Sequence, residues 1–401
     1  MTRESIREWV AALRPRYRKA SKGEKAVILS EFCATTGYHR KSAIRLLNRG
    51  PGGATAKRRG RPPTYGDPEF RRCLHILWRA SGYVCSKRLA PFMGELLDSL
   101  IRHGELLPDT KVHRQLLSVS PASIDRLLKP YRPRPLQWPH VASRTPGNLN
   151  QKIGVHTFGE LRQLGVGHLE VDLVFHCGLS VEGFHLTTLV GVDVRTGWVE
   201  CIPVWGKGAQ RVRASAEYLR RRLPFPLLGL HSDNGSEFIN YNLQSYCQQQ
   251  GISFTHSRPY HKNDLPRVEQ RNGSVVRQLV GYGRFNSHAA QEQLRIVYDL
   301  LSLHANFFQP LCKLVSYERR GAKVVKHYDR AQTAYQRLLA SGSASAELRE
   351  PLEARYRSLN PLALYERLME EVRRLWRLEA VDPASEQAAR LQALKEAVAT
   401  E

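Results

Sequence analysis

The sequence lacks the features of a secreted, disulfide-stabilised or membrane-spanning protein. Its seven cysteines are scattered, odd in number and without a CxxC pair, so neither a disulfide framework nor a structural zinc site is expected. No apolar run is long enough to cross a bilayer, and the charged start of the chain has no apolar segment of the kind found in signal peptides. We therefore expect a cytoplasmic protein whose cysteines are reduced thiols.

Acidic residues are scarce in the first part of the chain. Residues 1–150 contain 29 Lys and Arg against 11 Asp and Glu, whereas residues 151–290 contain 15 against 11 and residues 291–401 contain 17 against 15. The net charge of +24 is therefore concentrated in the first segment. Such a distribution indicates a module that binds a polyanion, joined to a nearly neutral enzyme. A chain of this length predicts roughly two to four globular domains.

Residues 1–50 are predicted to form a helix-turn-helix unit. Apolar positions recur at helical spacing through residues 25–47, and Gly37 interrupts them where a turn between two helices is needed. The second helix would present a basic side suited to the major groove of DNA, formed by His39, Arg40, Lys41 and Arg45. A plain basic helical hairpin is the alternative interpretation.

Residues 51–66 are rich in Gly and Pro and are predicted to be a basic linker. Within them, Arg59 and Arg61 belong to an Arg-Gly-Arg-Pro stretch that resembles the core of an AT-hook, a segment that lies in the narrow minor groove of A·T-rich DNA. An ordinary basic linker explains the same four residues equally well.

Residues 67–130 are predicted to be a second helical DNA-binding unit. Its last helix begins after Ser120 as N-cap, and this helix would present Arg126 and Lys129 to DNA. Residues 131–165, which are rich in Pro, Arg, Gly and Asn, are predicted to be a second linker.

From residue 168 the pattern changes to strands. Three strands would form an antiparallel meander and would be followed by alternating helices and strands. In the first strand, Glu170, Asp172 and Val174 are expected on one face. The predicted elements are strands at 168–177, 184–194 and 198–205, a helix at 207–223, a strand at 224–233, a helix at 236–250, a strand at 252–256 and a helix at about 263–281.

Three acidic residues stand at chemically informative places in this region. Asp172 lies inside the first strand, Asp233 lies in the motif HSDNGSEF, and Glu269 follows it in SRPYHKNDLPRVEQ with 35 residues between the two. Carboxylate oxygens are the ligands that Mg²⁺ prefers, and three carboxylates can hold two ions. A pair of such ions suits phosphodiester chemistry.

These motifs resemble the catalytic core of DDE transposases and retroviral-type integrases, in particular bacterial insertion-sequence transposases. The resemblance covers about residues 165–285, and the stretches GYHRKSAIRLL, VEQRNGSVVRQLVGY and NFFQP extend it over most of the chain. It implies a ribonuclease-H-like α/β core, a mixed five-stranded sheet flanked by helices. It also implies that Asp172, Asp233 and Glu269 are the catalytic residues and the ligands of two Mg²⁺, with Mn²⁺ as a substitute.

Several neighbouring residues have less specific roles. Lys262, Arg267 and Arg271 are expected to hold phosphates of DNA or to be solvated helix charges, and His231 is a further candidate for a DNA contact. Glu170 is expected to support the site from behind, Asp193 to be structural, and Glu237 to lie in the first turn of a helix. Leu265-Pro266 departs from the polar or small residues that relatives tend to carry there.

The sequence thus predicts a ribonuclease-H-like integrase core at residues 166–285, two N-terminal all-α DNA-binding units, and a mainly helical region at 286–401 with a strand pair around Arg320-Gly321. The resemblance implies a transposase that binds the terminal repeats of its element and cleaves and joins strands. Its expected partners are double-stranded DNA of the element ends and the target, and further copies of the chain on that DNA. No membrane or small-molecule cofactor is expected. The alternatives are a DNA-binding regulator with an inactive core, or a metal-dependent nuclease that does not join strands.

Overall fold

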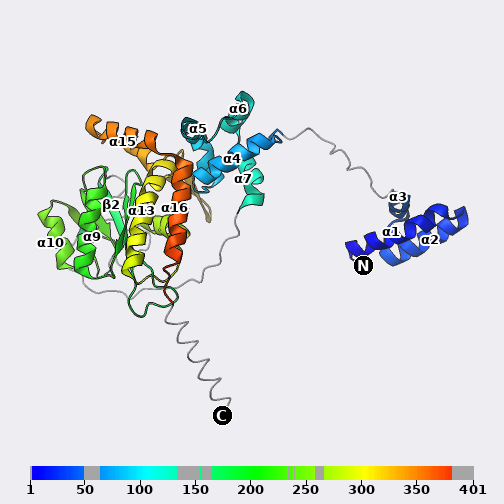
Figure 1. Ribbon diagram of the computed structural model, residues 1–401, viewed down its shortest axis with the longest axis horizontal. Coiled ribbons are helices and arrows are strands. Elements are labelled where there is room, and N and C mark those ends of the chain that lie inside the picture. Colours follow the sequence, from blue (N-terminus) through cyan, green and yellow to red (C-terminus); the bar gives the residue numbers. More distant parts are fainter. Residues whose placement is uncertain are drawn as a thin grey trace, which may run out of the picture. The chain divides into compact units, whose positions relative to one another are not determined.

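The computed structural model describes residues 2–48, 64–132, 154–155 and 164–381, apart from residues 234, 236, 239 and 258–265. The chain divides into two compact units, Met1–Gly66 and Asp67–Glu401 (Figure 1). Three residues that the sequence suggested as DNA contacts, Arg59, Arg61 and Lys262, lie outside the described residues.

The first unit consists of three helices, α1 (Arg3–Lys19), α2 (Lys22–Thr36) and α3 (Arg40–Asn48). A capping box between Ser21 and Glu24 begins α2, and Gly37 ends it in the left-handed conformation at φ 72°, which glycine adopts without a steric cost. The helices pack around Phe32 and Leu47, which are fully buried. The helices predicted before and after Gly37 are therefore present as α2 and α3.

The second unit begins with four helices, α4 (Pro68–Ala80), α5 (Ser86–Arg102), α6 (Thr110–Ser118) and α7 (Pro121–Leu128), followed by the 3-10 turn η1 (Lys129–Tyr131). Ser120 is the N-cap of α7, as the sequence predicted. These helices pack against the C-terminal part of the same unit. Arg79 forms an ion pair of 3.0 Å with Glu366, and the His304 Nε2 atom lies 2.9 Å from the Ala80 carbonyl oxygen.

A six-stranded mixed sheet forms the centre of the second unit (Figure 1). Its spatial order is β1-β6-β5-β2-β3-β4, and the strands are β1 (Gly154–Val155), β2 (His168–Phe175), β3 (Thr187–Asp193), β4 (Val199–Val204), β5 (Gly229–Ser232) and β6 (Ser253–His256). The antiparallel meander β2-β3-β4 and the parallel strands β5 and β6 confirm the predicted five-stranded ribonuclease-H-like sheet. The two-residue strand β1, which lies in the predicted linker, adds to its edge.

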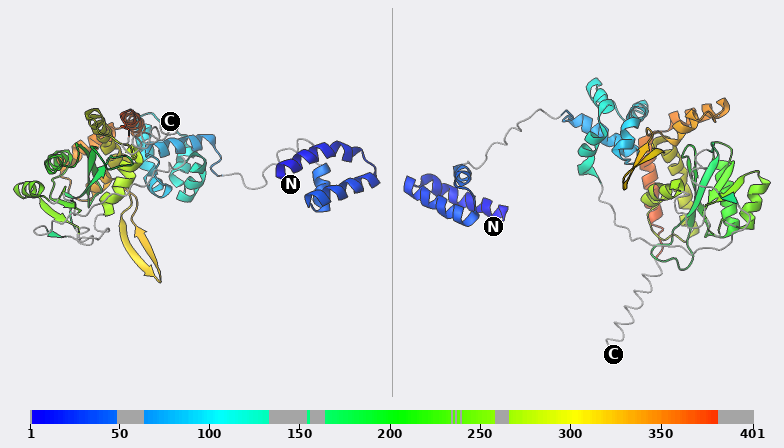
Figure 2. Two further views of the ribbon diagram at one scale, coloured as in Figure 1. Left: turned by 90° about the horizontal axis from the view of Figure 1, so that it is seen from below. Right: turned by 180° about the vertical axis from the view of Figure 1, so that it is seen from behind.

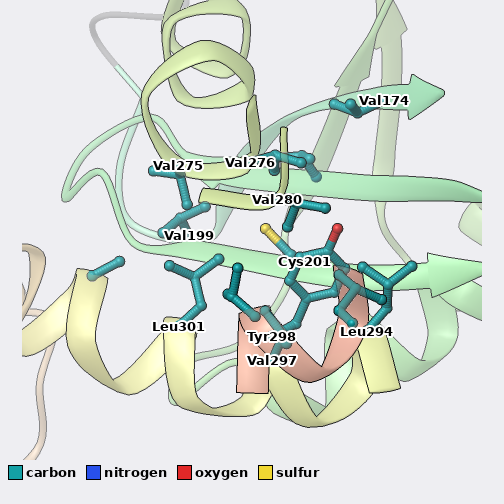
Figure 3. Packing of buried hydrophobic residues seen from close by; sticks show 14 of the residues in the cluster. Val174, Val199, Cys201, Val275, Val276, Val280, Leu294, Val297, Tyr298 and Leu301 are labelled. Carbon is teal, nitrogen blue, oxygen red and sulfur yellow. The ribbon is translucent and has the colours of Figure 1, made fainter. Parts of the chain in front are cut away.

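Helices cover both faces of this sheet. The helices α9 (Ala209–Arg222) and α10 (Tyr241–Gln249) lie on one face, where Leu219 of α9 packs so closely on Gly191 that a Cβ atom there would lie 2.6 Å from its side chain. The other face is covered by α11 (Pro266–Arg271), the π-helical turn η2 (Asn272–Arg277), the short α12 (Gln278–Val280) and α13 (His288–Phe308). Figure 3 shows side chains of the sheet, of η2 and of α13 meeting in one apolar core.

Two predicted helices differ in the structure. The helix after Asp233 begins at Tyr241 and not at residue 236, so Glu237 lies in a turn and not in the first turn of a helix. The helix that carries Glu269 is interrupted by η2, where the backbone bonds change to the wider π pattern. Single π-helical turns inside helices are often found at functional sites.

The C-terminal region contains the predicted strand pair, β7 (Leu314–Arg320) and β8 (Lys323–Tyr328), and the helices α14 (Ala334–Ala340), α15 (Ala346–Ser358) and α16 (Pro361–Trp376). Leu368, Val372 and Leu375 of α16 join the core that α13 forms with the sheet. Among the described residues, no helix has the length and apolar character needed to cross a membrane.

Candidate active site

The first predicted catalytic aspartate, Asp172, lies in β2, and the second, Asp233, directly follows β5, the strand that pairs with β2. Glu170 of β2 pairs with His231 of β5 in parallel register, and continuing that register by two residues brings Asp233 level with Asp172. Paired residues of parallel strands point to the same side of a sheet, and positions two apart share a face. Glu170 and Asp172 therefore share the face on which α11 and η2 lie, and Asp233 directly follows the end of β5 beside this strand.

The Asp172 carboxylate is nearly buried and is held on both of its oxygens. It is 9% exposed, its Oδ1 atom accepts a bond of 2.8 Å from the Leu173 backbone N–H, and its Oδ2 atom accepts a bond of 2.7 Å from the Asn272 side-chain amide. Asn272 begins η2, three residues after Glu269. The contact between Asn272 and Asp172 therefore ties the helix that carries Glu269 to the middle of β2.

Glu170 provides a second connection between β2 and the same helix. Its side chain is fully buried, and one carboxylate oxygen accepts bonds from the backbone N–H groups of Arg267 at 2.8 Å and Val268 at 2.9 Å. The other oxygen pairs with the Arg267 guanidinium at 2.6 Å. A carboxylate that accepts the first N–H groups of a helix supplies the cap that these groups otherwise lack.

Burial raises the pKa of the Glu170 carboxyl, although the charge of Arg267 and the two backbone N–H groups act in the opposite direction. The predicted supporting role of Glu170 thus takes a specific form in the structure. This residue caps and orients α11, and it stands two positions from Asp172 on the same strand face.

Glu269 is exposed and lies in the middle of α11. Residues three apart in a helix lie on one side of it, so Glu269 and Asn272 face in similar directions, and Asn272 reaches Asp172. The two connections through Glu170 and Asn272 therefore hold α11, which carries Glu269, against the strand that carries Asp172.

Asp233 is half-buried in the turn that follows β5. Its Oδ1 atom accepts a bond of 3.0 Å from the Gly235 backbone N–H. A Cβ atom on Gly235 would lie 2.7–2.8 Å from the carboxylate group of Glu237, so a side chain at this position would displace Glu237. The glycine thus allows two acidic side chains to share one tight turn.

The basic residues suggested as DNA contacts fall into two groups. Six of them are exposed: His39, Arg40, Lys41, Arg45, Arg126 and Lys129. The Arg267 guanidinium, in contrast, forms an ion pair with the Glu170 carboxylate. Arg271 is 7% exposed and donates a bond of 3.3 Å to the Gly197 carbonyl oxygen, and burial lowers the pKa of its guanidinium to about 10. These contacts give the two helix arginines structural partners inside the protein.

Two other expectations are settled by burial. His231 is 2% exposed, contacts the Thr255 hydroxyl and stacks on His168, so the suggested DNA contact is wrong. Asp193 is fully buried and accepts bonds from the backbone N–H groups of Gly167 at 2.8 Å and Thr196 at 2.6 Å. Its predicted structural role is confirmed.

Asn272 is the residue that the sequence interpretation missed. An Asn in a helix has no local pattern that marks a functional role, and only its position three residues after Glu269 could have pointed to it. Its Oδ1 atom is buried and has no hydrogen-bond partner among the described residues. This leaves one acceptor unused directly beside the Asp172 carboxylate.

The donor chemistry of the site fits divalent cations of the Mg²⁺ class, which take carboxylate oxygens and retain several waters. The unused Asn272 acceptor suits a water molecule bound to such a cation. No three His, Cys, Asp or Glu side chains within the described part of the chain lie together as a ready metal site.

Comparisons with known proteins identify the domain that contains Asp172 and Asp233. A family model described as an integrase core domain matches residues 166–262. The uncharacterized protein y4rM of Sinorhizobium fredii (strain NBRC 101917 / NGR234) is 42% identical over 321 residues, which cover 80% of this chain and 91% of that protein. The Pro-Pol polyprotein of Simian foamy virus type 1 is 30% identical over 95 residues, which cover 24% of this chain and 8% of the polyprotein.

Among solved structures, the chain is similar to the catalytic core domain of BIV integrase, with 21% identity and a TM-score of 0.30 over 44% of this chain and 97% of that domain. The strand order and the helix placement of the sheet described above carry the assignment of the fold.

Proposed function

This chain belongs to the same family as the Sinorhizobium protein and contains an integrase core domain of the polynucleotidyl transferase type, and from this premise we propose that it is a transposase. It binds the terminal DNA repeats of its element and catalyses metal-dependent strand cleavage and strand transfer. Its catalytic residues are Asp172, Asp233 and Glu269.

One observation supports the choice of these residues above all others. Just before Glu269 the chain is connected to β2 through the backbone N–H groups that donate to Glu170, and just after Glu269 it is connected through the Asn272 amide that donates to Asp172. Catalytic groups need to be held close to their working geometry by neighbours that are themselves fixed. This arrangement supplies such support for one aspartate and one glutamate that are far apart in the sequence.

In the proposed mechanism the three carboxylates would hold two Mg²⁺, and the bound ions would polarise the attacking hydroxyl or water and the scissile phosphate. Asp172 is oriented by the Leu173 N–H and by Asn272. Asp233 is oriented by the Gly235 N–H. Because Glu269 is exposed, its carboxylate is accessible to DNA from solvent.

DNA is held outside this core in the proposed scheme. Residues 1–50 and 67–130 bind the element ends through their exposed basic side chains, and residues 51–66 and 131–165 connect these units to the core at 166–285. Two DNA ends must be joined to one target, so the working form contains more than one copy of the chain. The region 286–401 supports the core, since α16 packs into it.

Two other functions are alternatives to this proposal. A DNA-binding regulator would need only the N-terminal units, and the supported acidic site argues against it. A nuclease that cuts without joining would use the same carboxylates, and two tandem helical units argue instead for recognition of defined DNA ends.

A strand-transfer assay tests the proposal. Labelled duplexes taken from the two flanks of the gene are incubated with the protein, a target plasmid and Mg²⁺, beside the Glu269→Gln variant. Joined product from the wild-type protein alone is expected. Cleaved but unjoined DNA would favour the nuclease, and tight DNA binding without chemistry would favour the regulator and direct attention to Leu265-Pro266.

A further inference from the structure

The β7–β8 hairpin is a two-stranded ribbon that projects from the second unit (Figure 2). Every residue of β7 except Leu314 and every residue of β8 except Val325 is exposed. An isolated two-stranded hairpin is at best marginally stable in water. A ribbon exposed on both faces therefore needs either strong support at its base or a partner that covers it.

The base of the ribbon is firmly held. Leu311 and Gln332 exchange two backbone bonds of 2.9 and 3.1 Å, and Asp329 is held by Arg337 at 2.7 Å. The Lys313 ammonium donates to the carbonyl oxygens of Val194, at 2.9 Å, and Arg195 in the turn after β3, and burial lowers its pKa to about 8. The ribbon is thus anchored to the central sheet, and only its length is open to solvent.

The turn of the ribbon also follows the demands of its backbone. Arg320 pairs with Lys323, which leaves Gly321 and Ala322 as a two-residue turn. Gly321 has φ 61°, and a glycine at the first central position suits the mirror-image turns that match the twist of a hairpin. The ribbon is therefore a built element with a defined register.

The exposed surface of the ribbon combines cations with tyrosines. Arg319, Arg320, Lys323 and Lys326 stand against one acid, Glu318, which pairs with Arg320 at 3.0 Å. Among the described residues, Arg319, Lys323 and Lys326 form no ion pair with a carboxylate. The cross-strand register places Arg319 opposite Val324 and Lys326 opposite Tyr317, so this face mixes charge with large side chains. Tyr317 is 68% exposed and Tyr328 is 56% exposed.

We propose that the β7–β8 ribbon is a DNA-binding arm that lies in a groove of duplex DNA. The major groove is wide enough to admit a two-stranded β-ribbon. The four cations of the ribbon are exposed on both of its faces and can reach phosphates on either side of such a groove. The tyrosines of the ribbon contact sugars and base edges. This inference rests on the proposed function, because only a protein that acts on DNA has use for such an arm.

A second copy of the chain is a less suitable occupant. In a symmetric dimer the same patch meets itself, so four cations and one acid on each ribbon would face an identical set. The like charges would repel each other, and the exposed Glu318–Arg320 pair would offset little of that repulsion. A polyanion has the charge that this surface lacks.

Binding of a generic 30-base-pair duplex tests the proposal. All proteins carry Glu269→Gln, so that cleavage does not alter the probe. The ribbon variant replaces its four cations: Arg319→Gln, Arg320→Gln, Lys323→Gln and Lys326→Gln. We expect its affinity at moderate salt to fall at least about tenfold, and the slope of log affinity against log salt to become shallower by up to about 3.6, since each of four phosphate contacts contributes about 0.9 to that slope.

A matched control removes the same charge from another surface. It replaces four exposed arginines of α15 and α16: Arg355→Gln, Arg357→Gln, Arg367→Gln and Arg373→Gln. We expect the control to lose much less affinity than the ribbon variant. Equal losses would mean that net charge, and not the ribbon, governs binding, and the proposal would be overturned.

The outcomes separate this inference from the proposed function. If the parent protein binds DNA and the ribbon variant binds equally well, only the DNA-binding arm is wrong. If the parent protein does not bind DNA at all, the proposed function fails as well. A ribbon variant that changes oligomeric state in light scattering, with unchanged DNA affinity, would assign the ribbon to contacts between copies of the chain and would overturn the proposal.

Chemical acetylation of lysines tests the ribbon without any substitution in it. The reaction rates of Lys323 and Lys326 are compared with and without the duplex by mass spectrometry. We expect both lysines to be protected severalfold by DNA. Unchanged rates on saturated complex would contradict the proposal, whatever the variants show.

Discussion

The sheet face beneath α11 and the β7–β8 ribbon arrange charged side chains in opposite ways. On the sheet face, Glu170 and Asp172 are nearly or fully buried, and each accepts hydrogen bonds from fixed donors. On the ribbon, the cations are exposed and largely unpaired with carboxylates. Buried charges must be satisfied by the fold itself, because an unpaired one is costly, whereas exposed cations keep their charge available for a ligand.

The difference suggests two separate tasks. Groups that take part in chemistry gain from preorganisation, which requires burial and fixed neighbours. Groups that attract a long polyanion gain from reach and from a field that extends into solvent. The comparison therefore predicts that changes on the sheet face alter chemistry and stability, while changes on the ribbon alter DNA affinity and leave stability unchanged.

The largest effect is expected from Glu269→Gln. Removing one charge that acts on the reacting atoms is expected to reduce strand transfer on the order of 10³-fold without weakening DNA binding. The matched control is Glu237→Gln, since Glu237 lies beside the Asp233 turn but outside the proposed triad. The amount of labelled strand-transfer product is measured for both variants. An equal loss of product from the control would mean that Glu269 is not the catalytic residue.

A large loss of stability is expected from Glu170→Ala. The substitution leaves the Arg267 guanidinium and two backbone N–H groups without their buried acceptor, which costs about 3 kcal/mol in the free energy of unfolding. Glu170→Gln keeps one acceptor oxygen and should lose less. Urea denaturation measures both, and strand transfer by the Gln variant should require more Mg²⁺ because α11 is held less firmly. Identical stability of the wild-type protein and the two Glu170 variants would show that Glu170 does not cap α11.

Acidification is expected to destabilise the sheet core through two buried histidines. Burial lowers the pKa of His176 to about 3 and that of His304 to about 4, whereas an unfolded histidine titrates near 6.5. The folded state therefore binds fewer protons than the unfolded state below that pH, so stability falls as pH decreases. Each histidine should contribute about 2 kcal/mol of loss at pH 5.

The pH dependence is checked with a variant that lacks one of the titrating groups. Thermal unfolding is followed between pH 8 and pH 5 for the wild-type protein and for His176→Gln. The variant should lose about half of the pH dependence, whatever its absolute stability. A slope unchanged from wild type would show that His176 does not remain neutral in the folded protein.

The smallest effect is expected on the stability of the ribbon. Tyr317→Ala removes a side chain that is 68% exposed, and surface substitutions of this kind usually change the free energy of unfolding by less than about 0.5 kcal/mol. The same urea denaturation as for Glu170 measures it. A loss comparable to that of Glu170→Ala would show that the ribbon is part of the packed core, and the comparison between the two regions would not hold.

Local patterns in the sequence predicted much of the fold. Alternation placed Asp172 and Glu170 on one face of β2, because side chains in a strand alternate whatever surrounds them. Ser120 and Gly37 marked the start of α7 and the end of α2, since caps depend on a few neighbouring residues. The pair of strands around Arg320-Gly321 was predicted from its turn in the same way.

Contacts between distant residues could not be predicted in this way. The capping of α11 by Glu170 joins residues 97 positions apart, and the contact between Asn272 and Asp172 spans 100. The burial of Arg271 depends on the turn that contains Gly197, which lies 74 positions earlier in the chain. Nothing in the local pattern of a helix shows which of its charges faces the core.

The sequence by itself determined the order of strands and helices, the concentration of positive charge before the core and the three acids proposed for catalysis, because periodicity, composition and short motifs are properties of neighbouring residues. Tertiary structure alone decided which charges are buried and which are exposed. It paired Arg267 with Glu170, buried Arg271 and His231 within the protein, and left the ribbon cations in solvent. Burial depends on every element that packs around a side chain, so it becomes defined only when the whole chain has folded.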